Sequence, residues 1–437
     1  MSDKELGHNL RKRTWATAKL AAKLGFSAAT KKLNIELPNS TEQAVEQAIA
    51  LANEFDGMKG LMLKFGQMAS YLNTGLPPKA QQALAKLQSS STAMPYTDIK
   101  SQIESSFNKE VGELFDSFDP EAFAAASIGQ VHRAVYKGQA VAVKIQYPGI
   151  RKLIESDLKN VGKLAQVLFV GSSLDGEGFA DELQDRLIEE CDYLLEAQRQ
   201  TVIGSLWNDK EGCIVPLVIP ERSTVTVLTT IFESGEGFYP FIKNASAQSR
   251  RKSSLTIFSN VFEGIFRYGF FNGDPHPGNY LFREEGGVVF LDFGCVRLFP
   301  DELLLIWKEL AQAILDQNFA RFKACSIDMG LVGNVKKFDW DFQWDLMQFF
   351  YQPFRSTTPY RYTHEYVKES YQRVLWQNKN RRYASLPPSM LLINRLQWGL
   401  NSILADLGAE AIYSDIFRAA VASKMEPLKG KRSRPII

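Results

Sequence analysis

The chain has few of the residues that build disulfide-rich or zinc-binding folds. Only four cysteines and four histidines occur among its 437 residues, and both types are scattered singly. Their spacing therefore indicates neither a disulfide framework nor a zinc site. The formal net charge of +2 is too close to balance to point to nucleic acid as a partner.

Long apolar runs are also missing. No uninterrupted apolar stretch approaches the roughly 18 to 20 residues that a membrane-spanning helix needs, and no secretory signal pattern is found. With a hydrophobic fraction of 45%, the chain can instead bury one large bilobal core or two to three domains.

Acidic residues are absent between Glu5 and Glu36, where lysines and arginines alternate with apolar residues such as Trp15 and Phe26. This composition predicts a basic helix that lies on an anionic membrane surface. A solvated helix or a frayed terminus is an equally weighted alternative.

The stretch from Phe270 to Gly294 carries the clearest chemical signal. Asp274 and Asn279 stand five residues apart, and Asp292-Phe293-Gly294 follows Asn279 by thirteen residues across a predicted β-hairpin. This is the spacing of a kinase site, in which the first aspartate faces the attacking hydroxyl group. Asn279 and Asp292 would then hold Mg²⁺, a hard cation that prefers oxygen ligands, against the phosphates of ATP. A surface hairpin with solvated carboxylates is the alternative.

A nucleotide site also needs a lysine, and Val141-Ala142-Val143-Lys144 ends a predicted strand in the pattern of the kinase lysine. Lys144 would bind the α- and β-phosphates. A long helix is predicted over residues 179–207, and its Glu196 would orient Lys144 through an ion pair, with Asp192 four residues earlier on the same face. The alternative is that these acids form a solvated helix face.

The predicted phosphate-covering loop departs from a kinase glycine-rich loop. Only its third glycine, Gly129, is present, and alanines replace the others. Because each alanine adds a Cβ and resists positive φ, we expect a stiffer cover and an unusual nucleotide pose. An alanine-rich strand lead-in without a ligand is the alternative. The predicted nucleotide contacts in this loop are Ala124, Ala125, Ala126, Ser127, Gly129 and Val131.

A strand pattern spans residues 225–232, and chain order alone assigns the adenine hinge to Ile231, Phe232 and Glu233. After Gly294 a new helix begins within six residues, at Pro300-Asp301, and no Ala-Pro-Glu segment follows. The chain therefore lacks the activation segment on which a protein Ser/Thr kinase holds its peptide substrate, which makes that activity the least favoured.

Taken together, these motifs resemble the UbiB family of atypical kinase-like proteins over about residues 44–299, and the coenzyme Q-associated branch most closely. The motifs are Lys64-Phe65-Gly66-Gln67, residues 124–132, Val141-Ala142-Val143-Lys144, Glu190-Cys191-Asp192, Glu196, Asp274-Pro275-His276-Pro277-Gly278-Asn279, Asp292-Phe293-Gly294 and, for the branch, Gln146-Tyr147-Pro148-Gly149.

The resemblance implies an α+β, bilobal protein-kinase-like fold with an N-terminal helical extension and a mostly helical C-lobe. We expect a basic segment over 1–38, an extension with the KxGQ motif over 39–115, an N-lobe over 116–232, a C-lobe over 233–425 and a basic tail over 426–437. In the family, the motif with Lys64 and Gln67 packs toward Glu190 and Asp192 and blocks the peptide cleft, which implies a regulatory role for all four residues.

The same resemblance implies an ATP- and Mg²⁺-dependent ATPase or small-molecule kinase that supports ubiquinone biosynthesis at a membrane. The implied partners are prenylated quinone precursors or other lipids, an anionic membrane surface and quinone-biosynthesis proteins. The expected location is cytoplasmic and peripheral at the inner membrane face, or mitochondrial in a eukaryote. A nucleotide-gated lipid- or protein-binding module with little turnover is the alternative.

Overall fold

The computed structural model describes residues 94–126, 128–152, 154–155, 188–385, 390, 393–426 and 428. The predictions made for Lys64, Gln67 and Ser127, and for most of the 39–115 extension, lie outside these residues. The chain divides into two compact units. The sheet unit comprises residues 1–195 and 219–231, and the helical unit comprises residues 196–218 and 232–437.

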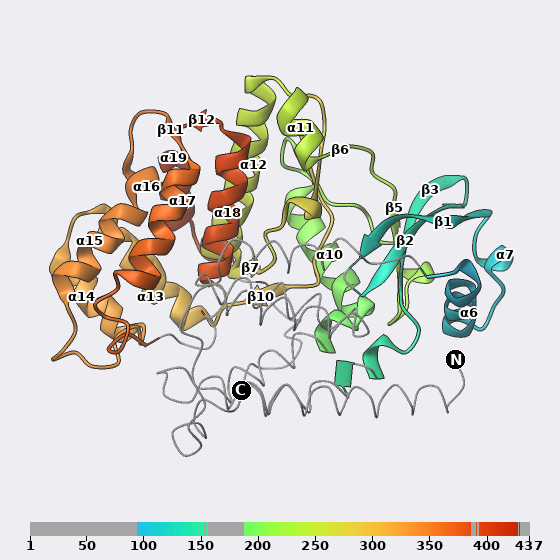
Figure 1. Ribbon diagram of the computed structural model, residues 1–437, viewed down its shortest axis with the longest axis horizontal. Helices are drawn as coiled ribbons and strands as arrows, with labels where there is room; N and C mark the ends of the chain where they lie inside the picture. Colours follow the sequence, from blue (N-terminus) through green and yellow to red (C-terminus); the bar gives the residue numbers. More distant parts are fainter. Residues whose placement is uncertain are drawn as a thin grey trace, which may run out of the picture. The chain divides into compact units, whose positions relative to one another are not determined.

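The sheet unit contains one antiparallel sheet with the strand order β1-β2-β3-β5 (Figure 1). Its elements are α6 (Tyr96–Phe107), α7 (Val111–Leu114), β1 (Ser117–Ala126), β2 (Gly129–Tyr136), β3 (Gln139–Gln146), the 3₁₀ turn Pro220–Arg222 and β5 (Val227–Ile231). Residues 136–139, Tyr-Lys-Gly-Gln, carry a hairpin signal in the sequence, and the structure confirms it by pairing Tyr136 with Gln139 between β2 and β3. Lys137 and Gly138 have φ values of 50° and 73°, the left-handed pair that a tight hairpin requires.

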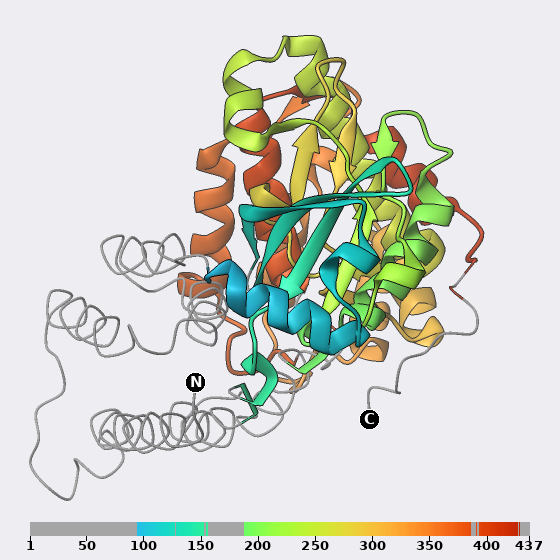
Figure 2. The same cartoon turned by 90° about the vertical axis from the view of Figure 1, so that its right-hand side faces the viewer.

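Helix α6 packs against this sheet (Figure 2). Its Ile99 and Ile103 are fully buried together with Val141, Val143 and Ile145 of β3. Each such side chain contributes about 1.5 to 3 kcal/mol when it leaves water. The strand that carries Lys144 is therefore fixed on its apolar face by a helix from the preceding segment.

The helical unit holds a small four-stranded sheet of order β4-β9-β8-β6, in which only β4 and β9 pair in parallel. Two further antiparallel pairs are β7 with β10 and β11 with β12. The strands are β4 (Cys213–Ile214), β6 (Glu236–Gly237), β7 (Phe270–Asn272), β8 (Tyr280–Phe282), β9 (Val288–Phe290), β10 (Val296–Leu298), β11 (Tyr360–Arg361) and β12 (Glu410–Ala411).

Helices supply most of this unit. They are α10 (Tyr193–Trp207), α11 (Phe238–Asn244), α12 (Ala247–Glu263), α13 (Asp301–Leu315), α14 (Phe319–Asp328), α15 (Trp340–Phe350), α16 (Gln352–Arg355), α17 (His364–Tyr371), α18 (Ile393–Leu407) and α19 (Ser414–Ala422). The first turn of α10 belongs to the sheet unit. The π segments Gly264–Tyr268 and Gln372–Trp376 follow α12 and α17, and Pro277–Asn279 forms a 3₁₀ turn. The predicted α+β class is confirmed.

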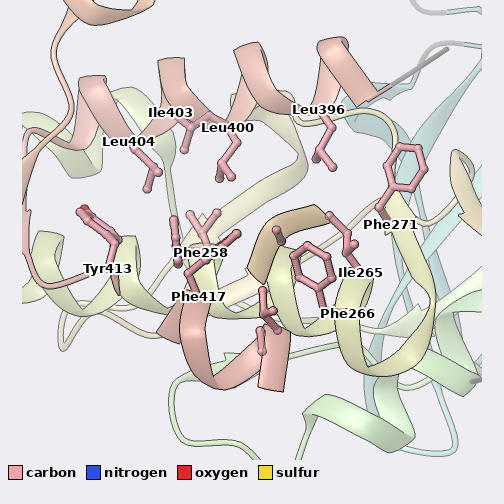
Figure 3. Packing of buried hydrophobic residues seen from close by; sticks show 14 of the residues in the cluster. Phe258, Ile265, Phe266, Phe271, Leu396, Leu400, Ile403, Leu404, Tyr413 and Phe417 are labelled. Atoms are coloured by element: carbon pink, nitrogen blue, oxygen red, sulfur yellow. The ribbon is translucent and has the colours of Figure 1, made fainter. Parts of the chain in front are cut away.

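An aromatic core joins these helices (Figure 3). Phe258 and Phe266 of α12 and its π segment are buried with Phe417 of α19, and α18 contributes Leu400 and Leu404 to the same cluster. No helix in the described ranges is long and apolar enough to cross a membrane.

The prediction of one long helix was wrong. The helix predicted over 179–207 breaks at Cys191-Asp192, and α10 begins at Tyr193. Asp192 Oδ1 accepts hydrogen bonds from the backbone N–H groups of Leu194 and Leu195, both at 3.1 Å. A side-chain oxygen that bonds the first free N–H groups of a helix is an N-cap. Asp192 and Glu196 therefore do not share one continuous helix face.

Candidate functional site

Asn272, at the end of β7, joins the two loops that carry the predicted kinase-type residues. Its side-chain Oδ1 accepts from the N–H of Asp274 at 3.0 Å, and its Nδ2 donates to the carbonyl of Asp292 at 2.6 Å. The pairing of Asn272 with Val296 of β10 adds a backbone link just after the Asp-Phe-Gly segment. One amide thus fixes the Asp274 loop against the Asp292 loop.

Asn279 lies in the same network. Its Nδ2 donates to the carbonyl of Asp274 at 2.8 Å, and its own carbonyl accepts from the N–H of Leu291 at 3.0 Å. Because the amide nitrogen is committed to Asp274, the amide oxygen of Asn279 is left in a defined orientation. The His276 ring supports this turn by accepting from the N–H of Gly278 at 3.0 Å.

Asp292 follows β9, and its Oδ1 accepts from the N–H of Gly294 at 2.9 Å. The phenol of Tyr280, the residue after Asn279 at the start of β8, is buried. Burial first, and then the negative charges of Asp274 and Asp292, raise the pKa of Tyr280 well above its usual value of 10. Two carboxylates therefore act on one buried phenol.

Glu196 is buried like Asp274, with 3% of its surface exposed. A Cβ added at Gly294 would lie 3.8 Å from Glu196 Oε2 and 3.3 Å from Asp292 Oδ1. Arg199, one turn along α10 from Glu196, donates from Nη1 to the carbonyl of Gly294 at 2.9 Å. The helix that presents Glu196 is thus bonded to the Asp-Phe-Gly segment.

Asp274 itself is 8% exposed, and its carboxylate forms an ion pair with Nη2 of Arg395 from α18. The sequence interpretation missed Asn272, Arg199 and Arg395. Asn272 stands two residues before Asp274, a spacing at which asparagine often bonds the backbone, so it could have been found. No local sequence pattern marked Arg199 or Arg395 as part of the site.

In the sheet unit, Lys144 lies on β3 opposite Val131 of β2 and Leu228 of β5. Its Nζ is 4.9 Å from the ring centroid of Tyr193, a cation–π distance. Lys144 belongs to the sheet unit and Glu196 to the helical unit, so the predicted ion pair between them stays a prediction.

The loop predicted to cover phosphates is a hairpin between β1 and β2. Ala124, Ala125 and Ala126 are the last residues of β1, paired with Val131, Gln130 and Gly129 of β2. Gly129 has a structural reason to be glycine, because a Cβ there would lie 2.1 Å from the carbonyl oxygen of Ile145. Whether these residues contact a nucleotide stays a prediction.

The remaining predicted positions lie at the edges of elements. Ile231 ends β5, and the division between the two units falls between Ile231 and Phe232. The Glu233 carboxylate pairs with Arg283 at 2.6 Å.

Cys191, between the predicted regulatory residues Glu190 and Asp192, is fully buried. Burial first, and then the charge of Glu190, raise the pKa of its thiol to about 12. Its thiol therefore stays protonated and unreactive.

Comparison with known proteins decides the family. A sequence model of the ABC1 atypical kinase-like domain matches residues 86–326, more than half of the chain. The chain belongs to the ABC1 atypical kinase-like family. The predicted resemblance to atypical kinase-like proteins is thereby confirmed. Membership implies phosphotransferase or ATPase chemistry as a class, without naming a substrate.

Relatives within this family cover much of the chain. It is 28% identical to the atypical kinase COQ8, mitochondrial, of Saccharomyces cerevisiae over 428 residues, which is 93% of this chain and 83% of the yeast protein. It is also 28% identical to the atypical kinase coq-8, mitochondrial, of Caenorhabditis elegans over 372 residues. That match covers 82% of this chain but spans only about half, 49%, of the nematode protein.

A solved structure shares the fold. The Mycobacterium tuberculosis protein Rv3197, in its complex with erythromycin, superimposes with a TM-score of 0.64 and 24% identity. The match covers 86% of this chain and 97% of that protein. Together with the domain match over residues 86–326, this likeness confirms the predicted kinase-like fold.

Proposed function

We propose that the chain is a Mg²⁺-dependent ATPase or small-molecule kinase that supports ubiquinone biosynthesis at a membrane. The observation that carries this proposal is the bonded group of Asp274, Asn279 and Asp292, held together by two hydrogen bonds of the Asn272 side chain and one of the Asn279 side chain. Their carboxylate and amide oxygens are the donors that a hard cation prefers. Family membership supports this class of chemistry, and this group is the site that we propose for it.

The residues fit a magnesium–nucleotide site in chemical terms. Asn279 and Asp292 offer an amide oxygen and a carboxylate, which are the oxygen ligands that Mg²⁺ takes in proteins. Asn279 and Asp292 would hold the ion, which when bound neutralises charge on the transferred phosphoryl group. Lys144 would bind the α- and β-phosphates, and Glu196 would orient it.

Asp274 would act on the nucleophile. Its backbone is held at the N–H by Asn272 and at the carbonyl by Asn279, and its carboxylate is held by the ion pair with Arg395. A carboxylate so placed accepts the proton of a water molecule or an acceptor hydroxyl as the oxygen attacks. Burial of Asp274 strengthens this interaction because the local dielectric is low.

The membrane role is proposed from the basic residues between Glu5 and Glu36 and from the names of the relatives. Two relatives are named mitochondrial atypical kinases. We infer peripheral contact with an anionic membrane, with prenylated quinone precursors or other lipids as candidate substrates and quinone-biosynthesis proteins as candidate partners.

The proposal is tested by ATP hydrolysis and by phosphoryl transfer to a quinone-precursor analogue, measured with and without anionic liposomes. Asp292→Asn removes one charge from the metal site and should reduce Mg²⁺-dependent turnover to background. Asp328→Asn, an exposed acid at the end of α14, is the matched control and should leave turnover intact. Turnover by Asp292→Asn at the wild-type rate would refute the role of this residue.

A different outcome would select the nucleotide-gated binding module. In that case the wild-type protein would bind ATP without measurable turnover, and its affinity for lipid or a partner protein would change with nucleotide. Phosphorylation of a separate protein by the intact chain would instead favour a protein kinase.

A further inference from the structure

Helix α18 packs within the helical unit. Its apolar face, with Leu396, Leu400, Ile403 and Leu404, points into the aromatic core shared with α12 and α19 (Figure 3). Leu396, in the first turn of α18, belongs to the same buried cluster as Phe271 of β7 (Figure 3), and β7 leads directly into Asp274. The start of α18 therefore lies beside the loop that carries the proposed base.

The contact between α18 and this loop is unusually close. A Cβ added at Gly399 would lie 2.3 Å from Pro275 Cγ and 2.9 Å from the Pro275 carbonyl oxygen. Even a methyl group would therefore displace either the helix or the loop. Gly399 thus allows α18 to approach the residue that follows Asp274.

Arg395 lies four residues before Gly399, on the same side of the helix. Its Nη2 forms the ion pair with Asp274 Oδ1, and both residues are 8% exposed. The guanidinium group is planar and always charged, so it restricts the rotation of a carboxylate that it binds. Asn272 and Asn279 fix the backbone of Asp274, whereas Arg395 fixes its side chain.

We infer that Arg395 is a positioning residue, which holds the Asp274 carboxylate in the orientation that the attacking oxygen requires. It acts through Asp274 and not on the nucleotide. The inference rests on the proposed function. It adds one residue of α18 to the proposed site, and α18 lies beyond the residues 86–326 matched by the family domain. A buried pair retained for geometry is expected to affect turnover more than affinity.

The first experiment compares Arg395→Met with Arg395→Lys in steady-state ATP hydrolysis. Arg395→Met should lower kcat by about tenfold to hundredfold and leave KM for Mg-ATP within about twofold of wild type, because the proposed nucleotide contacts remain while the orientation of Asp274 is lost. Arg395→Lys keeps the charge without the planar donor pair and should recover part of kcat. An unchanged kcat in Arg395→Met would overturn the inference.

The matched control is Arg373→Met. Arg373 forms an ion pair with Glu369 at 2.6 Å in the same unit, but this pair is partly exposed, with 34% and 48% of the two side-chain surfaces open to solvent. Loss of an exposed pair has little effect, so kcat should match wild type. A loss of kcat in Arg373→Met equal to that in Arg395→Met would overturn the inference, because any arginine of this unit would then do the same.

A second measurement separates positioning from simple support of the fold. In an Asp274→Asn background, Arg395→Met should reduce the residual kcat by less than about twofold, because the group that it orients is already altered. Equal fold losses in both backgrounds would overturn the inference. Should Arg395→Met fail to fold, the same comparison is made with Arg395→Lys, whose melting temperature should stay within a few degrees of wild type. A kcat of Arg395→Lys equal to that of the wild-type protein would again overturn the inference.

These outcomes are distinguishable from failure of the proposed function. A wild-type protein that binds Mg-ATP but shows no turnover would overturn the proposed function, and the positioning role with it. A wild-type protein that turns over ATP, together with an equally active Arg395→Met variant, would overturn only the role of Arg395.

Discussion

At the scale of single residues, Gly129 shows how one position can satisfy a motif and a packing requirement at once. In the sequence it matches the last glycine of a kinase loop. In the structure, a Cβ at this position would lie 2.1 Å from the carbonyl oxygen of Ile145, so β2 and β3 can pair at this end only without a side chain. The motif match alone is therefore not proof of phosphate contact.

Gly129→Ala should destabilise the protein by about 2 kcal/mol, because backbone atoms of β3 cannot move aside without strain. Urea unfolding followed by circular dichroism measures this change. Gly112→Ala is the control, since nothing lies within 4 Å of a Cβ there; its stability should be unchanged or higher by up to about 1 kcal/mol. Equal stabilities of the two variants would show that the strands separate at little cost.

At the scale of elements, local patterns predicted some of the strands and hairpins, among them β3 and β5. The strand with Lys144, the 136–139 turn and the helix after Pro300 all follow from residue types within a few positions of one another. The break at Cys191-Asp192 was missed because the helical apolar spacing continues across it. The pairing of Arg395 with Asp274 was missed because 121 residues separate the two, and no local pattern reports a contact at that distance.

The start of α10 gives a test of what Asp192 does. Asp192→Ala should lower the free energy of unfolding by about 1 kcal/mol, because two backbone N–H groups lose their acceptor. Asp192→Asn keeps an oxygen at the same place and should cost only a few tenths of a kcal/mol. Chemical denaturation of both variants checks this order.

The same two variants separate capping from the regulatory role that the family resemblance implies. Asp192→Asn removes the charge and keeps the cap, so a change in ATP turnover in this variant at unchanged stability would reveal a role for the charge. If Asp192→Ala were as stable as wild type, the cap would contribute nothing and our account of the helix start would be wrong.

At the scale of the whole molecule, stability should depend on pH through His132, which is fully buried in the sheet unit. Its Nδ1 lies 2.8 Å from the carbonyl of Asp119, and its Nε2 lies 3.0 Å from Nε2 of Gln130. The carbonyl can only accept and the Gln130 amide nitrogen can only donate. The neutral ring with its proton on Nδ1 satisfies both contacts, whereas a doubly protonated ring would set two donors against each other.

Burial accordingly lowers the pKa of His132 below its usual value of 6.5. As pH falls below about 6.5, the unfolded chain binds a proton that the folded protein does not, so this contribution to stability is lost, and the loss levels off below the folded pKa. Thermal unfolding between pH 7.5 and 5 should therefore give a falling midpoint. Other groups also titrate in this range, so His132→Phe, which keeps a ring stacked near Phe118, is compared with wild type. The variant should be less stable at pH 7.5 yet show a shallower fall, and parallel pH curves for the two proteins would contradict the neutral, buried histidine.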